Sequence, residues 1–512
     1  MSLLLSSCSD MLDVKPTSQW GADQVPKELA HLHGILNGGY ERIGATLIGT
    51  FPIYGDGRAD VYYANNAGAP NYDRLLRSQL DGDLSWSNWQ NFYTIIRQAN
   101  MNIYYVPKMI ADGTIDDNSE TRSILGQAYC QRAFAYFWIA RIWGGCPLIL
   151  EPILNSLETP ALKRSPLDSV MMQIHADLDL ALEYIPAQTS ASAVTRTRFS
   201  PTAVHALKAH AYMWEHKYVE ALAELNTAIP TSTTLYDLVS LYTPDVIPPA
   251  SLNDDNSSQA IRSYISSTGF VQMFNSNTGA TGKESIFEIA QSSADNDINN
   301  TFNSYWLNSS GTYFKVREDL RNCFTPNDFR YYASIEAMSG GKCDAQKWIH
   351  GYEKGDAYNV VMIRLADLLL LRAEANIMLA TDEVTDTERT AIMKDINKIM
   401  VRASGLGIEA GNDTIPGYLN RDEYPNKESF LSLMKEERRK ELVFEGQRWF
   451  DLVRWGDAYT ALKAMVPAEY ATYPYETGPV ELDPLGRDLV WPIYLEEIRR
   501  SGGLIEQNEY YK

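Results

Sequence analysis

Several long segments of the chain carry small and apolar residues at the spacing of amphipathic helices. The clearest of them, residues 201–230, predicts two helices joined near His216 and Lys217. Its small or apolar positions include Ala209, Tyr212, Ala221, Leu225 and Ala228. These offsets follow the tetratricopeptide repeat, in which small residues let paired helices approach closely, although His205 stands where the repeat has tryptophan and Thr233 where it has proline. The segment therefore predicts a helix pair of this kind.

Helix starts and two further segments extend the pattern. Ser165-Pro166 and Ser200-Pro201 each place a capping hydroxyl before a proline, so we expect a helix to begin at both places. Residues 123–143 and 364–380 repeat the small and apolar positions at helical spacing. Because the intervals between these segments are irregular, the sequence predicts a mainly α fold, a tetratricopeptide-like superhelix of about four helix pairs interrupted by an insertion.

The insertion is predicted between residues 231 and 358, where Ser, Thr, Asn, Asp and Gly dominate. Only short strand-like runs occur in it, such as Ser285–Ile289. We expect residues 85–230 and 360–462 to form the helical scaffold, and residues 463–512, with several prolines and tyrosines, to form an extended tail packed on it. On this interpretation residues 9–512 are one domain.

The N-terminus carries a short targeting pattern. Leu3-Leu4-Leu5-Ser6-Ser7-Cys8 has the apolar run and the small residues that precede the lipid-modified cysteine of bacterial lipoproteins. Because the apolar run is short and no basic residues open it, we interpret residues 1–8 as a truncated signal that ends at the anchor Cys8. Nowhere does the chain approach the roughly 18–20 uninterrupted apolar residues that a membrane-spanning helix requires.

Composition limits the classes of ligand. The 512 residues include 45 Lys and Arg against 65 Asp and Glu, a formal net charge of −20 that repels nucleic acid. The chain is also rich in aromatic residues, with 31 Tyr and 11 Trp. Such side chains combine a flat apolar face with a polar edge, which suits burial in a core and also suits contact with sugar rings. Composition alone leaves both uses open.

The cysteines do not form a metal-binding or redox motif. Cys130 and Cys146 flank a strongly apolar helical segment, so we expect buried thiols. Cys323 and Cys343 lie in a loop-rich region, where a disulfide in an exported chain is one option that their spacing leaves open.

No residue set predicts a metal site or a cofactor. His31 and His33 have no third ligand nearby, so we interpret them as ordinary surface or core histidines. Residues 295–299 have the oxygen spacing that opens a calcium loop, but Asn300 replaces the turn glycine and Trp306 the closing glutamate. This favours a solvated acidic loop.

The most specific segment is ERRKELVFEGQRWFDLVRWG, residues 437–456. Its apolar residues step by three and four and predict one helical stripe, formed by Leu442, Gly446, Trp449, Phe450 and Val453. Glu436 and Lys440 can pair one helical turn apart. The segment resembles the C-terminal signature of the SusD/RagB family. Other places that resemble this family are Cys8-Ser9-Asp10 with Leu12-Asp13, Trp89 to Asn100, Arg364 to Ala375, and Trp491 to Tyr510, where Glu509 stands in place of the usual proline and glycine.

This resemblance implies a function as well as a fold. Members of the family are surface glycan-binding lipoproteins of the outer membrane of Gram-negative bacteria. They capture an oligosaccharide or polysaccharide and pass it to a SusC-like TonB-dependent transporter, on which they sit as a lid. The resemblance therefore implies a protein that is anchored to the membrane by lipid, binds carbohydrate and catalyses no reaction itself.

Two loops offer the chemistry that a sugar site needs, which is an aromatic platform bordered by hydrogen-bonding side chains. In the loop 54–68 the candidates are Tyr62 and Tyr63 as platforms, with Arg58, Asp60, Asn65 and Asn66 as polar partners. In the insertion the candidates are Tyr305, Trp306 and Tyr313. The alternative for both loops is that their aromatic residues merely pack on the scaffold.

Two other classes of function remain as alternatives. An all-helical glycoside hydrolase needs two carboxylates facing each other across a cleft. The densest acidic cluster is Glu437, Glu441 and Glu445, but these residues recur every fourth position among basic residues, which favours salt bridges along a helix. The other alternative is a tetratricopeptide scaffold that binds peptides in a groove.

Overall fold

The computed structural model describes residues 25–64, 70–154, 162–188, 193–230, 236–241, 252, 255–275, 283–291, 305, 313–337, 343–348, 359–404, 423–464, 483 and 486–512. The α-helices in these ranges are α1 (Leu29–Leu47), α2 (Phe51–Gly55), α3 (Pro70–Leu76), α4 (Gln90–Ala111), α5 (Ser119–Trp143), α6 (Leu167–Tyr184), α7 (Ala193–Arg196), α8 (Pro201–Trp214), α9 (Tyr218–Ala228), α10 (Asp255–Ile265), α11 (Gly269–Asn275), α13 (Glu318–Arg321), α14 (Phe329–Ser334), α15 (Leu365–Leu379), α16 (Asp386–Ala403), α17 (Lys427–Glu441), α18 (Arg448–Trp455), α19 (Ala458–Ala464) and α20 (Leu495–Arg500). Short 3-10 turns occur at η3 (Ser85–Ser87) and η8 (Glu509–Tyr511). The predicted mainly α fold is confirmed.

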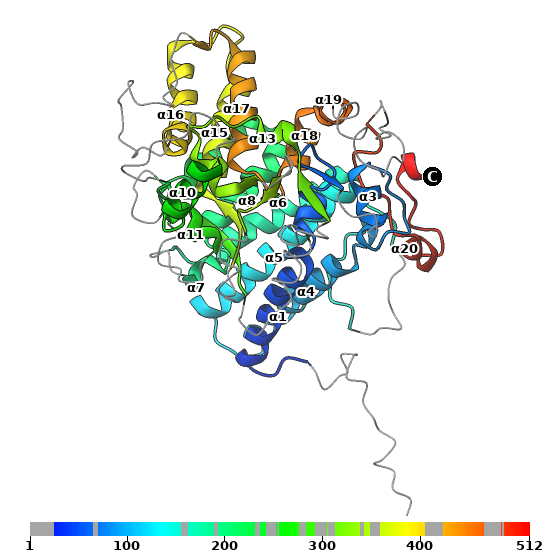
Figure 1. The fold of residues 1–512 in the computed structure, drawn as a ribbon. Coiled ribbons are helices and arrows are strands. Elements are labelled where there is room, and N and C mark those ends of the chain that lie inside the picture. Colours follow the sequence, from blue (N-terminus) through cyan, green and yellow to red (C-terminus); the bar gives the residue numbers. More distant parts are fainter. Residues whose placement is uncertain are drawn as a thin grey trace, which may run out of the picture.

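The long helices pack in succession around α5 (Figure 1). Helix α1 packs on α4, α4 on α5, α5 on α6, α8 on α9, and α9 on α15. Helix α5 is buried along most of its length because helices cover it on several sides. The predicted helix pair in residues 201–230 is confirmed as α8 and α9; the segment 123–143 falls within α5, and α15 takes up all of the segment 364–380 except its two end residues. Cys130 and Cys146 are buried free thiols, as predicted.

The two predicted helix starts differ. At the second, Ser200 caps α8 by accepting a hydrogen bond from the Ala203 backbone N–H at 3.1 Å, with a proline at the first helical position. At the first, helix α6 begins one residue later than predicted, because Pro166 is itself the cap. Ser165 instead forms an isolated β-bridge with Cys146.

Six short strands lie among the helices of the described ranges and form two sheets. The strands are β1 (Tyr62–Ala64), β2 (Ser285–Ile289), β3 (Phe314–Val316), β4 (Ile335–Ala337), β5 (Cys343–Ala345) and β6 (Val360–Arg364). One sheet has the order β1-β3-β5-β4 and the other pairs β2 with β6, and every pairing is antiparallel. The strand predicted at residues 285–289 is confirmed. The insertion also contains helices, among them α10 and α14, which the sequence analysis did not predict.

The single helix predicted across residues 437–456 is wrong. Helix α17 ends at Glu441 and α18 begins at Arg448, with a turn between them in which Phe444 and Gly446 have positive φ angles of 65° and 70°. This turn packs against α2 so closely that a Cβ atom on Gly55 would lie 1.8 Å from the Gly446 carbonyl oxygen. The apolar stripe is therefore divided between two helices. The predicted pair between Glu436 and Lys440 is present at 3.4 Å.

We expect Gly55→Ala to lower the free energy of unfolding by about 1–3 kcal/mol, because the added methyl group has no room against the Gly446 backbone. Gly34→Ala in the interior of α1 is the matched control. No atom lies within 4 Å of the added Cβ there, so this variant should be stabilised by roughly 0.5–1 kcal/mol. Urea unfolding followed by circular dichroism measures both changes, and equal stabilities of the two variants would contradict the packing of α2 on the turn.

Candidate functional site

Two of the predicted ligand residues hold the C-terminal helices instead of lining an open surface. The Arg58 side chain is fully buried, and its guanidinium lies 4.2 Å from the centroid of the Trp449 ring. The Asp60 carboxylate pairs with Arg448 at 2.7 Å and with Arg439 at 2.9 Å. Burial alone would raise the pKa of Asp60, but the two arginines outweigh it and lower that pKa to about 2. Both residues are thus occupied by structural contacts.

Tyr62 is also an interior residue. Its ring is 1% exposed and is stacked between Phe314, at a centroid distance of 4.9 Å, and Phe444, at 5.7 Å. Tyr63 is 8% exposed. The expectation that Arg58, Asp60 and Tyr62 contribute to an open sugar site is therefore wrong, because the turn after α17 and the strands of the insertion cover this part of the chain.

The pairing of β1 with β3 brings the two predicted loops to the same place. The strands are antiparallel, with Tyr63 opposite Lys315 and Ala64 opposite Phe314. The chain thus leaves β1 at the same end of the ladder at which it enters β3. Asn65, Asn66 and Trp306 belong to these loops but lie outside the described residues.

At this end of the ladder four aromatic side chains form what we call the aromatic cluster. Its members are Tyr72 on α3, Trp86 on η3, Tyr305 and Tyr313. Tyr72 and Tyr313 are stacked with a centroid distance of 4.0 Å and an interplanar angle of 9°, and Trp86 meets the Tyr72 ring edge-on at 4.9 Å. Tyr305 is buried and its hydroxyl donates to the Gly49 carbonyl at 2.6 Å, whereas the other three rings remain partly exposed. Such a group can present apolar ring surface to a ligand.

The sequence analysis identified Tyr305 and Tyr313 but missed Tyr72 and Trp86. Both missed residues lie in short polar stretches, NYDRL and SWSNW, that precede the first long scaffold helices. The polar surroundings alone do not separate accessible from buried rings, since Trp89 of the second stretch is 2% exposed. What brings these rings beside the insertion is the strand pairing, which joins residues more than two hundred positions apart and leaves no local signal.

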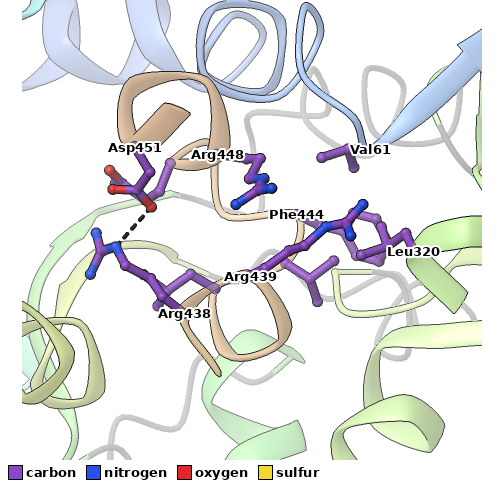
Figure 2. Close-up of a pocket in the computed structure, with 10 residues that line it drawn as sticks. Val61, Leu320, Arg438, Arg439, Phe444, Arg448 and Asp451 are labelled. Atoms are coloured by element: carbon purple, nitrogen blue, oxygen red, sulfur yellow. Dashed lines mark hydrogen bonds and ion pairs between the residues drawn. The ribbon is translucent and has the colours of Figure 1, made fainter. Parts of the chain in front are cut away.

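A second candidate is a small pocket between α17, α18 and the end of the loop before β1 (Figure 2). It is lined by Val61, Leu320, Arg438, Arg439, Leu442, Val443, Phe444, Gln447, Arg448 and Asp451. Its three arginines already have carboxylate partners, since Arg438 pairs with Asp451 at 2.7 Å, and Arg439 and Arg448 pair with Asp60. The pocket therefore has little free charge or hydrogen-bonding capacity for a ligand.

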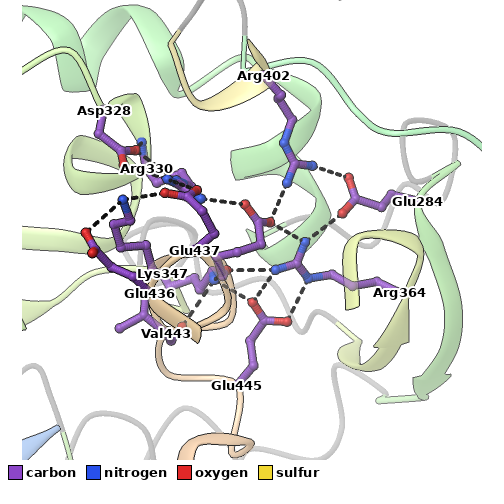
Figure 3. Close-up of polar contacts among 12 residues, drawn as sticks. Glu284, Asp328, Arg330, Lys347, Arg364, Arg402, Glu436, Glu437, Val443 and Glu445 are labelled. Carbon is purple, nitrogen blue, oxygen red and sulfur yellow. Dashed lines mark hydrogen bonds and ion pairs between the residues drawn. The ribbon is translucent and has the colours of Figure 1, made fainter. Parts of the chain in front are cut away.

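The cluster Glu437, Glu441 and Glu445 is buried, which differs from the salt-bridged helix face that the sequence predicted. Instead of pairing mainly along their own helix, these carboxylates receive cations from other parts of the chain (Figure 3). The ion pairs join Arg330 with Asp328, Glu437 and Glu441; Arg364 with Glu284, Glu441 and Glu445; Arg402 with Glu284 and Glu441; and Lys347 with Glu445. We call this set the buried charge network.

The pKa values in the network follow from burial and from these pairs. Burial would raise the pKa of Glu441, but Arg402, Arg364 and Arg330 outweigh it and hold that pKa well below the ordinary value of 4.5. For Lys347 burial prevails over the attraction of Glu445 and lowers the pKa to about 8. The network carboxylates are thus engaged by buried cations in the interior, where they hold the fold together.

Other side chains with candidate chemistry have structural surroundings. Cys323 has a free thiol that accepts a hydrogen bond from Arg439 at 3.1 Å, so the optional bridge to Cys343 is not formed. His31 and His33 are exposed, and each contacts a nearby glutamate, as expected of ordinary histidines. Within the part of the chain that the structure describes, no group of three His, Cys, Asp or Glu residues is placed to hold a metal ion. The acidic loop 295–299 lies outside that part. None of the described helices is both long and apolar enough to cross a lipid bilayer.

Comparison with known families identifies the chain. Residues 249–511 match the model of the SusD family, and residues 10–213 match a model described as starch-binding and associating with the outer membrane. The chain belongs to the SusD family. The resemblance seen in residues 437–456 and elsewhere is thereby confirmed.

Curated relatives and solved structures agree with this SusD membership. SusD-like protein P38 of Formosa agariphila is 26% identical over 531 residues, which cover 99% of this chain and 96% of that relative. A crystal structure of a SusD superfamily protein from Bacteroides thetaiotaomicron superposes with a TM-score of 0.70 at 22% identity, covering 97% of this chain and 100% of the other. A laminarin-binding SusD-like protein has a TM-score of 0.70 at 20% identity, covering 95% of this chain and 100% of its own. The fold of the chain is thus that of solved SusD-family structures.

We expect Glu441→Gln to lower the free energy of unfolding by about 3–5 kcal/mol, because it leaves buried arginines without their shared carboxylate. At acidic pH the free energy of unfolding of this variant should also depend less steeply on pH than that of the wild type. The low pKa of Glu441 means that its stabilisation is present above the unfolded pKa and is lost as the pH falls toward the folded one. Urea unfolding at a series of acidic pH values measures both effects.

Glu436→Gln is the control for this experiment, because Glu436 is exposed and contacts Lys440 only at 3.4 Å. Glu436→Gln should lower the free energy of unfolding by less than about 1 kcal/mol. Equal losses in the two variants would show that the buried charge network has no special role in stability.

Proposed function

We propose that this SusD-family protein is a surface glycan-binding protein that captures an oligosaccharide or polysaccharide and delivers it to a SusC-like TonB-dependent transporter. The observation that carries the proposal is the aromatic cluster. Its three partly exposed rings lie beside one another at the end of the β1–β3 ladder. Stacking on such rings and hydrogen bonding at their edges is the chemistry by which proteins hold sugars. Relatives of the same fold described as laminarin-binding and as surface glycan-binding proteins support the ligand class.

The ligand residues that we propose are Tyr72, Trp86 and Tyr313, whose rings form the platform. The buried Tyr305 ring packs against Tyr72 and Tyr313 and supports them. Asn65, Asn66 and Trp306 remain proposed contacts from the two loops, since both loops adjoin the strand ends at which the cluster lies. Tyr63 lies on β1 next to these loops and is proposed as a further support. Binding without catalysis is the expected behaviour.

The two alternative functions, a glycoside hydrolase and a peptide-binding scaffold, have less support in the structure. A glycoside hydrolase needs a pair of accessible carboxylates, whereas the densest acidic cluster, Glu437, Glu441 and Glu445, is committed to buried arginines and a lysine. A peptide-binding scaffold would use a groove between helices and would have no need of exposed rings at the end of a strand ladder. Neither class accounts for the aromatic cluster.

We also propose that Cys8 carries the lipid anchor and that the protein lies on the outer face of the outer membrane. The matched model that is described as associating with the outer membrane supports this location. Acyl chains at one cysteine that together bury many methylene groups give stable attachment to a bilayer. Cys8 lies outside the described residues, so this proposal depends on the sequence pattern and on the family.

The double variant Tyr72→Ala with Trp86→Ala should weaken glycan binding by roughly thirtyfold or more, since it removes the central rings of the platform. Affinity is measured by isothermal titration across a panel of glycans, and chromatography of the reaction mixture tests for cleavage products. Tyr264→Ala is the control, because Tyr264 is an aromatic residue that is 62% exposed on α10 in the insertion.

Three outcomes would contradict the proposal. Unchanged affinity of the double variant would remove the aromatic cluster from the site. Release of shorter sugars would favour the hydrolase, and binding of peptides alone would favour the scaffold.

Cys8→Ala should move the protein from the membrane fraction to the soluble fraction of cells, because it removes the only atom to which the lipid is expected to be attached. The measurement is immunoblotting of fractions from a strain that expresses the full chain with its natural signal. Retention of the variant in the membrane fraction would defeat the proposed anchor.

A further inference from the structure

Arg141 on α5 is a buried cation whose hydrogen-bond donors are unused within the described part of the chain. The residue is 7% exposed. No described oxygen accepts a hydrogen bond from its guanidinium, and no described carboxylate lies within ion-pair distance of it. Of its three side-chain nitrogen atoms only Nε is fully buried, so the two terminal amino groups reach the surface. Because buried polar groups in proteins are almost always hydrogen-bonded, this arrangement indicates a group that binds something outside the chain.

Aromatic rings from two helices cover this guanidinium. Its central carbon atom lies 4.3 Å from the centroid of the Phe137 ring, 4.6 Å from that of Trp138 and 4.2 Å from that of Phe450. Phe137 and Trp138 belong to α5, and Phe450 belongs to α18. Contact with ring faces holds a cation without using its N–H donors, which point outward in the plane of the ion. The rings therefore fix the guanidinium and leave its donors available.

The acidic groups that attract Arg141 are already in contact with other cations. Asp451 pairs with Arg438 at 2.7 Å (Figure 2). Asp367 pairs with Arg438 at 2.7 Å and with His210 at 2.8 Å. Burial lowers the pKa of Arg141 to about 9, although the charges of Asp451 and Asp367 oppose this shift. Arg141 is thus a cation at neutral pH that these carboxylates attract only through space.

The partly exposed face of α8 adjoins this place. His210 and Trp214 are one helical turn apart on α8, so they lie on the same face of the helix, and both are partly exposed. His210 contacts Asp367, and the Trp214 ring meets the Phe450 ring edge-on at a centroid distance of 6.4 Å. The surroundings of Arg141 are therefore connected to the surface through these two contacts.

We propose that the terminal amino groups of Arg141 form a binding site for a small monocarboxylate anion. The site shares no residue with the aromatic cluster, so it goes beyond the proposed glycan binding and does not depend on it. A flat carboxylate matches the fork of guanidinium donors. Because rings cover the guanidinium, a ligand has to approach in its plane, where the out-of-plane oxygens of a tetrahedral anion would meet the rings. The charges of Asp367 and Asp451 further disfavour a divalent anion.

The first test is a titration of the full chain with ¹³C-labelled acetate, in which the width of the acetate NMR signal reports binding. We expect saturable binding to the wild type and a loss of at least about tenfold in affinity in Arg141→Met, which removes the donors and keeps an apolar chain among the rings. Sulfate at the same ionic strength should compete at least about tenfold more weakly than unlabelled acetate. The absence of saturable binding, an unchanged affinity in Arg141→Met, or stronger competition by sulfate would each overturn the proposal.

Arg122→Met is the matched control for charge. Arg122 lies near the start of the same helix in an exposed pair with Asp117 at 2.7 Å, so this variant removes one positive charge at another place. It should keep the wild-type affinity for acetate, and a loss equal to that of Arg141→Met would assign the effect to overall charge and overturn the proposal. Arg141→Lys keeps the charge but lacks the fork of donors, so it should bind acetate more weakly than the wild type.

The second test separates a ligand site from an arginine that only supports the fold. Arg132 on α5 is 4% exposed, and its guanidinium donates to both carboxylate oxygens of Asp177, at 2.7 Å and 2.8 Å. Arg132→Met should lower the melting temperature sharply, because it leaves a buried carboxylate without its partner. Arg141→Met leaves no such carboxylate and should change the melting temperature much less in buffer without acetate. A decrease as large as that of Arg132→Met, followed by circular dichroism, would show that Arg141 supports the fold and would overturn the proposal.

Discussion

The contact on which the rest of this structure depends is the buried carboxylate of Glu441 among the arginines Arg330, Arg364 and Arg402. These four residues come from helices or strands of the insertion, the scaffold and the C-terminal signature. Removing charges from water is costly, and only a fully matched set of partners offsets that cost. The matched set therefore favours the one arrangement in which all three parts of the chain meet, and any arrangement that separates them leaves a charge without a partner in the interior.

The network also positions the candidate site, although it does not touch it. Lys347 donates to the Val443 carbonyl, and the Trp348 indole donates to the Phe444 carbonyl, so the turn after α17 is fixed in place. The Phe444 ring then stacks on Tyr62, Tyr62 on Phe314, and Phe314 meets Tyr72 edge-on at 5.5 Å. A continuous line of packed rings thus connects the charged interior to the platform. A platform held in this way loses little conformational entropy when a ligand arrives.

The features that the sequence predicted well are those with local causes. Helical periodicity was sufficient for α5, α8, α9 and α15, a capping serine also marked the start of α8, and a short strand-like run within a polar segment was sufficient for β2. The errors have a common physical origin, because each depends on contacts between residues far apart in the chain. Arg58 and Asp60 are buried because partners from the C-terminal helices neutralise or cover them, and those partners lie almost four hundred positions away. The helix break at Gly446 likewise depends on the close approach of Gly55.

The candidate site shows how far such reasoning extends. The insertion loop could be chosen from its aromatic content and supplies Tyr305 and Tyr313, whereas Tyr72 and Trp86 lie outside both chosen loops. Which rings stay accessible is decided by long-range packing, because Tyr62 fills the space between β3 and the turn after α17, whereas Tyr72 and Tyr313 stack beyond the end of the ladder. Among the described residues, the matched charges thus lie inside and partly exposed rings lie at this end of the strand ladder. Ring contacts of this kind are individually weak, at about 0.5–1.5 kcal/mol each, and many weak contacts on a rigid surface suit the capture and release that we propose.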